Sequence, residues 1–182
     1  LLQQQRLRLH NNLYIFIMNI DIIDDFLTDY QFKQIESSLM GDNFPWYYNN
    51  MMLSKDHSSY NPNHYQLTHN LLESDFSPLL SSFFNKLSLE VVYRVKCNMT
   101  PKTYFHRING YHTDWKDVNE IPPTAKVGIF YVNTNNGGTK FKKGSKVKSV
   151  ANRMLIFDAS LEHSGITCTN EKRRVVINFN YK

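Results

Sequence analysis

Apolar and polar positions in the second half of the chain alternate in short runs separated by Pro, Gly and Asn, a pattern typical of β-strands. Eight such runs occur, at residues 90–99, 103–112, 124–133, 138–142, 146–150, 153–157, 163–168 and 173–181. A shorter apolar run at 20–23 predicts one further strand near the start. Eight short strands after two helices predict a mainly β fold, in which N-terminal helices buttress a double-sheet jelly-roll core.

The two helices are predicted from signals in the first half of the chain. A capping box at 28–31 opens the first helix, and Gly41 is expected to end it. Three apolar residues share one side of this helix at helical spacing: Phe32, Ile35 and Leu39. A Ser-Pro pair at 77–78 is predicted to cap and open the second helix, which continues to Leu87. The intervening 42–70 segment has no helical period and predicts irregular strands and loops.

Length and composition are those of a single globular domain. A chain of 182 residues with 41% hydrophobic and 14% aromatic residues can bury a sizeable core, which excludes a largely disordered protein. Residues 18–182 are expected to form one domain, whereas 1–17 are interpreted as an upstream or non-native extension. The apolar run at 13–18 is too short to span a bilayer. Cys97 and Cys168 lack the spacing of a zinc ribbon or a disulfide framework, which favours a reducing, intracellular setting.

Charge is divided unequally along the chain, whose net charge is +5. Residues 1–90 carry 5 Lys/Arg against 10 Asp/Glu, a net −5, whereas residues 91–182 carry 16 against 6, a net +10. The basic half favours anionic ligands, and a small dicarboxylate satisfies it as well as a nucleic acid does. The lysines within 140–148 are interpreted as the solvated face of an edge strand, with contact to a phosphate backbone as the alternative.

Two histidines and one aspartate in the basic half are the candidate metal ligands. His112 and Asp114 are two positions apart, so both side chains point to the same face of an extended strand end. His163 follows Asp114 by 49 positions and must come from a different strand, which the facing sheets of a jelly roll permit. Two imidazoles and one carboxylate hold a divalent iron on one face and leave the opposite face open, which suits oxygen-activating chemistry. Taken alone, each histidine is better explained as a surface or hydrogen-bonded residue, and only the combination with Asp114, Arg174 and the predicted fold favours metal binding.

Arg174 is the candidate anion-binding residue. It begins the alternating segment 174–181, in which Val175 and every second residue after it form an apolar face. Arg174 lies on the opposite face, where a buried guanidinium needs an anionic partner, and a carboxylate that accepts two hydrogen bonds would satisfy it. Alternation turns Arg173 toward the apolar face, so its side chain is expected to reach solvent at the start of the strand.

Five motifs follow one another in a characteristic order: His112-x-Asp114, Gly137-Gly138-Thr139-Lys140-Phe141, the 152–157 segment, His163 and Arg174. This order resembles that of the iron(II)/2-oxoglutarate-dependent oxygenases, in particular the prolyl-hydroxylase-like branch and its small members from phages and marine microbes. The resemblance spans residues 96–181 and implies a double-stranded β-helix, or cupin-like, core. It is specific for the superfamily and does not fix a substrate.

The resemblance implies a role for each candidate residue. His112, Asp114 and His163 would bind Fe(II), and 2-oxoglutarate would chelate the same metal and leave one position for dioxygen. Arg174 would pair with the distal carboxylate of 2-oxoglutarate, and the Tyr131 hydroxyl would support that carboxylate; an ordinary core aromatic is the other interpretation of Tyr131. The implied activity is a dioxygenase that couples decarboxylation of 2-oxoglutarate to succinate with hydroxylation of a substrate, with ascorbate as a candidate reductant.

The substrate is open at this point. A peptidyl residue such as proline, or a small molecule, is favoured, and a nucleic acid demethylated by the same chemistry is an alternative that the basic half suggests. A third hypothesis is a non-enzymatic jelly-roll binding protein. No membrane partner is expected, and the resemblance implies the cytoplasm of a bacterium or of a phage-infected host cell. Asn98 and Tyr104 are candidates for the pocket wall, and Trp115 for the substrate side.

Overall fold

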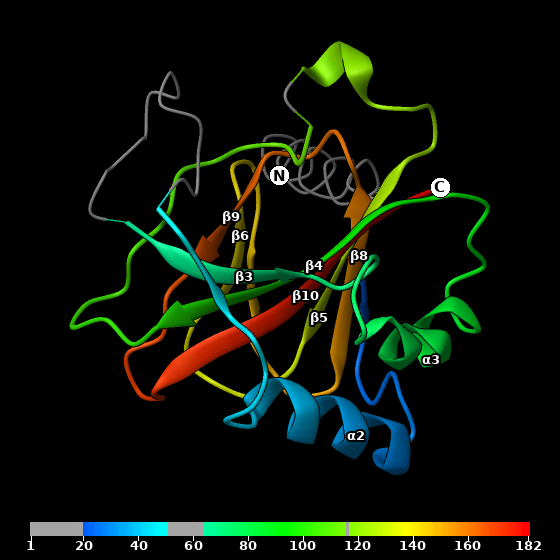
Figure 1. Cartoon of the computed structure of the whole chain (residues 1–182). Helices are drawn as coiled ribbons and strands as arrows, with labels where there is room; N and C mark the ends of the chain where they lie inside the picture. The colour runs from blue at the N-terminus through cyan, green and yellow to red at the C-terminus, as the bar shows by residue number, and fades with distance from the viewer. Residues whose placement is uncertain (1–19, 51–63, 116) are drawn as a thin grey trace, which may run out of the picture.

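Two antiparallel sheets packed face to face form the body of the protein (Figure 1). The computed structural model describes residues 20–50, 64–115 and 117–182. The main sheet has seven strands in the order β1-β8-β5-β10-β4-β3-β2, and the minor sheet has three in the order β7-β6-β9. Neighbouring strands are antiparallel throughout both sheets. The mainly β, jelly-roll fold predicted from the sequence is therefore confirmed.

The helices precede most of the strands along the chain. The first half contributes β1 (Ile20–Ile23), α2 (Asp29–Met40), β2 (Tyr47–Asn49), β3 (Gln66–Asn70), the 3-10 helix η1 (Ser77–Leu80) and α3 (Ser81–Phe84). The second half contributes β4 (Val92–Pro101), the 3-10 helix η2 (Val118–Glu120), β5 (Lys126–Tyr131), β6 (Gly138–Phe141), β7 (Lys146–Lys148), β8 (Arg153–Asp158), β9 (His163–Ile166) and β10 (Arg173–Tyr181). None of the helices in the described ranges combines the length and the apolar character that crossing a membrane requires.

Helix α2 forms as the sequence predicts. The Thr28 hydroxyl accepts a hydrogen bond from the backbone N–H of Gln31, and the Gln31 side chain accepts one from the backbone N–H of Thr28. These two bonds satisfy N–H groups that a helix start otherwise leaves unpaired. At the other end, the Gly41 N–H donates to the Ser38 carbonyl. The three predicted apolar residues of the helix are all buried against the main sheet: Phe32, Ile35 and Leu39.

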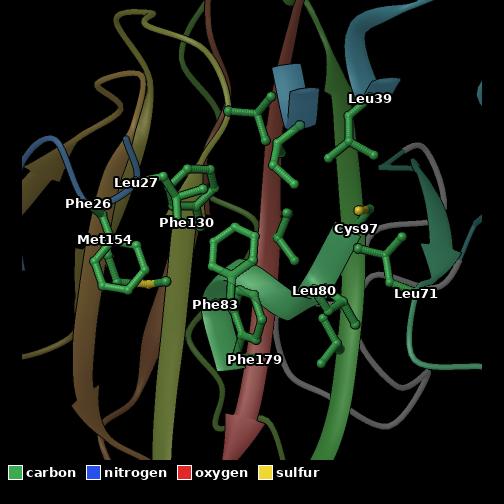
Figure 2. Close-up of a cluster of buried hydrophobic side chains, with 14 of the residues drawn as sticks. Phe26, Leu27, Leu39, Leu71, Leu80, Phe83, Cys97, Phe130, Met154 and Phe179 are labelled. Atoms are coloured by element: carbon green, nitrogen blue, oxygen red, sulfur yellow. The ribbon is translucent and has the colours of Figure 1, made fainter. Parts of the chain in front are cut away.

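Two hydrophobic clusters lie on opposite faces of the main sheet. The larger one, under α2 and α3, is centred on the fully buried Phe83 (Figure 2). The Phe83 ring packs against Phe130 and Phe179, with ring centroids 4.8 Å and 4.9 Å away. The smaller cluster fills the space between the sheets and includes Tyr131, Phe141, Val147, Leu155, Phe157 and Val176. The helices therefore cover the outer face of the main sheet, and the minor sheet covers its inner face.

The prediction of a strand at 103–112 is wrong. The segment makes only isolated bridges, at Ile108 and His112, and its Tyr104 is 95% exposed. Separate backbone hydrogen bonds and side-chain contacts, rather than a continuous ladder, hold it to the end of the minor sheet. The Thr103 N–H donates to the Cys168 carbonyl, and the Thr167 N–H donates to the Arg107 carbonyl. Thr103 Oγ1 lies 2.6 Å from Thr167 Oγ1, and His106 Nδ1 lies 2.7 Å from the Thr167 carbonyl oxygen. The alternating residues thus resemble a strand in sequence but form a loop.

The second helix is shorter than predicted and starts differently. Its N-cap position is Phe76, which makes no side-chain cap, and Ser77 lies inside the first turn. The backbone N–H of Ser77 donates to the Ser74 carbonyl, and the Ser74 hydroxyl accepts from the Phe76 N–H. Ser74, rather than the predicted Ser77, therefore accepts the hydrogen bonds from the backbone N–H groups at the start of this helix. The predictions for 1–17 and for the middle of 42–70 lie outside the described residues.

Candidate metal centre

The structure brings His112, Asp114 and His163 together. One possible ligand atom from each side chain lies within 4.8 Å of the other two. His112 and His163 face each other across an isolated antiparallel bridge, in which each backbone N–H donates to the other carbonyl at 3.0 Å. Nε2 of each imidazole lies 3.9 Å from Asp114 Oδ1. Two imidazole nitrogens and a carboxylate oxygen at this separation can hold one divalent cation.

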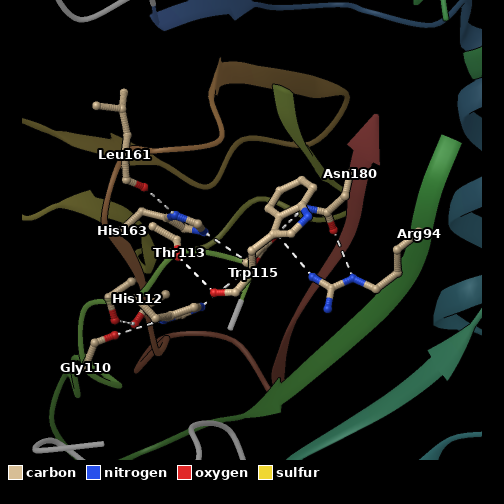
Figure 3. A network of polar contacts seen from close by, with 11 residues as sticks. Arg94, Gly110, His112, Thr113, Trp115, Leu161, His163 and Asn180 are labelled. Carbon is tan, nitrogen blue, oxygen red and sulfur yellow. Dashed lines mark hydrogen bonds and ion pairs between the residues drawn. The ribbon is translucent and has the colours of Figure 1, made fainter. Parts of the chain in front are cut away.

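Both imidazoles are oriented by a backbone carbonyl two residues earlier (Figure 3). His112 Nδ1 lies 3.2 Å from the Gly110 carbonyl oxygen, and His163 Nδ1 lies 3.0 Å from that of Leu161. Because a carbonyl can only accept, Nδ1 donates in both rings, and Nε2 keeps its lone pair on the side of Asp114. Burial lowers the pKa of His163, although Asp114 opposes that shift. A neutral ring is the form that binds a metal.

Asp114 is held in place by two groups from the main sheet, Asn180 and Arg94, which face each other in Figure 3. Asn180 of β10 donates from Nδ2 to Asp114 Oδ2 at 2.8 Å, and Nη2 of Arg94 from β4 lies 3.2 Å from the same oxygen. Arg94 Nε also donates to Asn180 Oδ1 at 2.9 Å, which closes the triangle. Burial alone raises the pKa of the Asp114 carboxyl, but His163, Arg94 and Asn180 together bring it below its ordinary value. Oδ1 is left to face the histidines.

Arg174 is buried on the inner face of the main sheet and, among the described residues, has no acidic partner. Its side chain makes a long hydrogen bond of 3.5 Å to Thr139 Oγ1, and its guanidinium carbon lies 5.6 Å from the centre of the Tyr131 ring. The Arg174 Nε atom is buried without any hydrogen-bond partner. The Tyr131 hydroxyl donates to Thr139 at 2.8 Å. An unpaired buried guanidinium is costly, so this environment suits an anionic ligand.

Gly137 makes room for the Arg174 side chain. A Cβ atom at position 137 would lie 2.6 Å from the Ile166 carbonyl oxygen and 3.2 Å from Arg174 Cδ. Real Cβ atoms do not approach a backbone oxygen that closely, so any side chain at 137 would displace either the β9 backbone or the arginine. The Gly-Gly-Thr motif found in the sequence thus leaves space for Arg174 and supplies Thr139 as its contact.

Unpaired polar atoms continue along the inner face beyond Arg174. Residues paired across an antiparallel ladder share a face, and β10 pairs Arg174 with Thr100, Val176 with Asn98, Asn178 with Lys96 and Asn180 with Arg94. Three buried oxygen atoms in this row have no hydrogen-bond partner among the residues that the structure describes: Asn98 Oδ1, Thr100 Oγ1 and Asn178 Oδ1. Buried polar atoms are nearly always paired in folded proteins. The row between Arg174 and the His-Asp-His cluster therefore fits a polar ligand such as a small dicarboxylate.

A pocket that is open to solvent lies at the Thr100 end of this row. Its wall includes Thr100, Asn109, Thr167 and the basic residue Arg107, and no acidic residue lines it. Burial and the neighbouring Arg107 lower the pKa of His64, which also lines the pocket. The electrostatic character of this part of the protein is therefore basic, as the charge distribution of the sequence predicts.

Several residues differ from their sequence-based interpretation. Arg173 does not simply reach solvent, because its guanidinium donates to the Met40 carbonyl at the end of α2. Tyr104 is too exposed to form a pocket wall, whereas Asn98 lies on the inner face as expected. Trp115 is half-buried and packs edge-on against Tyr93, with ring centroids 6.1 Å apart. The lysines of 140–148 lie on the β6–β7 hairpin, where β7 is the edge of the minor sheet.

Sequence reasoning missed the two residues that hold Asp114. Asn180 was placed on the Arg174 face by alternation, but nothing in the sequence linked it to Asp114. Arg94 is 86 positions from Asn180 and meets it only through the pairing of β4 with β10. Alternation within each strand shows only which residues share a face. The register between β4 and β10, which the sequence does not reveal, is needed to place Arg94 beside Asn180.

The fold can be compared with those of known proteins. No protein-family model and no curated protein sequence matches the chain. Its architecture is nevertheless that of the iron(II)/2-oxoglutarate-dependent oxygenases. The chain is similar to the viral collagen prolyl hydroxylase of Paramecium bursaria Chlorella virus-1, solved as a 2-oxoglutarate complex, with 15% identity, 88% of this chain and 94% of that chain covered, and a TM-score of 0.55.

Two further solved structures show the same likeness. HygX from Streptomyces hygroscopicus, solved with nickel and 2-oxoglutarate, is 12% identical, with 93% of this chain and 85% of that chain covered and a TM-score of 0.61. SnoK, an alpha-ketoglutarate-dependent carbocyclase from nogalamycin biosynthesis, is 9% identical, with 90% and 80% covered and a TM-score of 0.66. At these identities the likeness establishes the fold. The roles of His112, Asp114, His163, Arg174 and Tyr131 stay predictions that rest on the geometry above.

Proposed function

We propose that the protein is an Fe(II)- and 2-oxoglutarate-dependent dioxygenase that hydroxylates a substrate. The observation that carries the proposal is Arg174, a buried guanidinium without an acidic partner in the described part of the chain. It lies on the inner face of the main sheet, where Asn180 of the same strand contacts the candidate ligand Asp114. When bound, iron and 2-oxoglutarate would supply the oxidising chemistry, in which 2-oxoglutarate and dioxygen yield succinate, carbon dioxide and a hydroxylated substrate. The fold shared with 2-oxoglutarate-dependent oxygenases supports this assignment.

The protein side chains would position both groups. Nε2 of His112 and His163 and Oδ1 of Asp114 would hold the iron, since these atoms already face one another. Arg174 would donate to the distal carboxylate of 2-oxoglutarate through its guanidinium. The Tyr131 hydroxyl donates to Thr139 Oγ1, so the Thr139 hydroxyl keeps its own proton for a ligand. Tyr131 would then support the carboxylate through Thr139 rather than by direct contact.

A peptidyl residue such as proline is the substrate that we propose to test first. The likeness to a viral collagen prolyl hydroxylase supports this choice. Large aromatic side chains are exposed on β2 and in the loop after β4, where Tyr48 is 66%, Tyr104 is 95% and Phe105 is 81% exposed. Exposed aromatic rings are surfaces on which extended, proline-rich segments pack. A small-molecule substrate would leave this aromatic surface without a role.

Succinate formation is the direct test of the activity. The purified protein is incubated with Fe(II), ascorbate as reductant, 2-oxoglutarate and a proline-rich peptide, and succinate and oxidised peptide are measured by mass spectrometry. Visible absorption of the anaerobic iron and 2-oxoglutarate complex measures co-substrate binding when turnover without the right substrate is slow. Asp114→Ala is the matched control and should lose both signals. A parent protein with no affinity for 2-oxoglutarate would refute the proposal and favour the non-enzymatic binding protein.

A further inference from the structure

Lys96 lies on the inner face between Arg174 and the metal-ligand cluster, and no acidic residue is bonded to it. The side chain is half-buried, and within the described ranges its ammonium makes neither a hydrogen bond nor an ion pair. Directly across the ladder, the Asn178 Oδ1 atom is buried and also unpaired. Burial lowers the pKa of Lys96, Arg94 lowers it further, and only Asp114 opposes these shifts. Lys96 is therefore a cation that the folded chain itself does not neutralise.

Arg94 is a second cation two positions earlier on the same face of β4. Its side chain is 41% exposed, although it contacts both Asp114 and Asn180. Those contacts use Nε and Nη2, and a guanidinium has five N–H donors, so donors remain for a ligand. Arg94 and Lys96 together form a cationic pair beside the carboxylate that would bind the metal.

The charges of a site with metal and 2-oxoglutarate bound would leave Arg94 and Lys96 without a counter-charge. Asp114 is the one carboxylate in the described cluster, and a divalent metal would more than neutralise it. The two carboxylates of 2-oxoglutarate would balance Arg174 and the rest of the metal charge. The positive charges of Arg94 and Lys96 would then remain, beside the Asp114 carboxylate that would bind the metal. Partly buried charges that stay unpaired are costly, so an anionic group on the incoming substrate would complete the site.

We infer that the substrate carries an anionic oxygen group, either a carboxylate or a phosphate, that binds Lys96 and Arg94 beside the carbon to be oxidised. This inference rests on the proposed 2-oxoglutarate-dependent activity and names the substrate class of that site. An acidic or phosphorylated residue close to the target residue of a peptide would meet this requirement. Lys96 is the specificity-determining residue of the pair, because Arg94 also holds Asp114.

The test measures binding to protein loaded with Mn(II) and 2-oxoglutarate, which does not turn over, by isothermal titration calorimetry. Each of two probe pairs compares an anionic molecule with its neutral counterpart: N-acetyl-aspartate amide against N-acetyl-asparagine amide, and N-acetyl-phosphoserine amide against N-acetyl-serine amide. At least one anionic probe should bind 10-fold or more tightly than its neutral partner, and the pair that responds distinguishes carboxylate from phosphate. Lys96→Gln should weaken that probe at least 5-fold and change 2-oxoglutarate affinity less than 2-fold. Lys148→Gln, at an exposed position on β7, removes the same charge and should change neither affinity.

Three results would overturn the inference. Equal binding of charged and neutral probes, or none, with 2-oxoglutarate still bound, would remove the anionic substrate and leave the proposed activity in place. A loss of 2-oxoglutarate affinity in Lys96→Gln, with an unchanged melting temperature, would assign Lys96 to the co-substrate. Failure of the parent protein to bind 2-oxoglutarate at all would remove the proposed activity, and the inference with it.

Discussion

Replacing Arg174 with Met should stabilise the ligand-free protein and at the same time abolish 2-oxoglutarate binding. Methionine has a flexible, unbranched side chain that fills a similar path through the core without charge or donors. The two effects have opposite signs because the buried guanidinium opposes folding but favours binding of a carboxylate. An arginine that only stabilises the fold would behave in the reverse way.

The magnitude follows from the surroundings of Arg174. Leaving a buried charge unpaired costs several kcal/mol. The contact of the guanidinium with the Tyr131 ring offsets about 1–2 kcal/mol of this cost. The 3.5 Å hydrogen bond to Thr139 offsets at most about 0.5 kcal/mol more. The variant should therefore gain about 1–3 kcal/mol in free energy of unfolding. For a chain of 182 residues each kcal/mol corresponds to about 2–4 °C in melting temperature.

Urea unfolding and thermal melting of the parent and the Arg174→Met variant measure both effects. With Mn(II) present and 2-oxoglutarate at 100 times its Kd, the parent should gain about 2.7 kcal/mol and the variant nothing. Arg153→Met is the matched control, because the Arg153 guanidinium pairs with both carboxylate oxygens of Asp24 at 2.5 Å and 2.8 Å. That exposed pair is worth about 0–1 kcal/mol, so the control should be neutral or less stable. An Arg174→Met protein destabilised by more than about 1 kcal/mol would show that the guanidinium is already satisfied and refute the reasoning.

Three further substitutions test the site, the core and the surface. Asn180→Ala removes the 2.8 Å bond to Asp114 and should weaken Mn(II) binding about 10–100-fold in a calorimetric titration; unchanged affinity would mean that Arg94 alone suffices. Phe83→Ala empties the centre of the larger cluster and should cost about 3–5 kcal/mol in urea unfolding, and a loss below about 1 kcal/mol would contradict the packing shown in Figure 2. Burial, with a contribution from Asp21, raises the pKa of Tyr181 to about 12. Because the folded state favours the neutral phenol, its stabilisation is complete below pH about 10 and is lost as the pH rises through 12. Tyr181→Phe should thus reduce alkaline destabilisation between these pH values by about 1–2 kcal/mol, and parallel pH profiles would exclude this role.

The parts of the fold that local pattern determines were predictable. The capping box at Thr28 and the buried stripe of α2 follow from neighbouring residues, and both are present. The 103–112 segment was not predictable, because its alternation is that of a strand, while the folded segment is held by scattered backbone hydrogen bonds and by side-chain contacts at Thr167. Whether an alternating run forms a ladder depends on a partner strand that the run itself does not specify.

The residues of the candidate site also differ in whether local sequence or strand pairing reveals them. His112 and Asp114 are two positions apart, and the order of motifs adds His163 and Arg174. These four candidates could therefore be found without knowing how the strands pair. Arg94 and Lys96 become visible only when β4 is aligned with β10, since a shift of one residue would turn both side chains to the opposite face. The interpretation of Arg173 was incomplete for a similar reason: its carbonyl partner at Met40 lies on a distant helix.

Arg174 and Asn180 lie six residues apart on the single strand β10, about 20 Å along its axis. Since Asn180 holds Asp114, the backbone of this strand sets the separation between the Arg174 guanidinium and the Asp114 carboxylate. β10 pairs with β4 on one side and β5 on the other, so it cannot slide without breaking two ladders. A slip of two residues would keep every side chain on its face yet move the guanidinium by about 7 Å. The two ladders therefore fix the distance between the Arg174 guanidinium and the Asp114 carboxylate. Any ligand that contacted both groups would have to match a distance that the main chain determines.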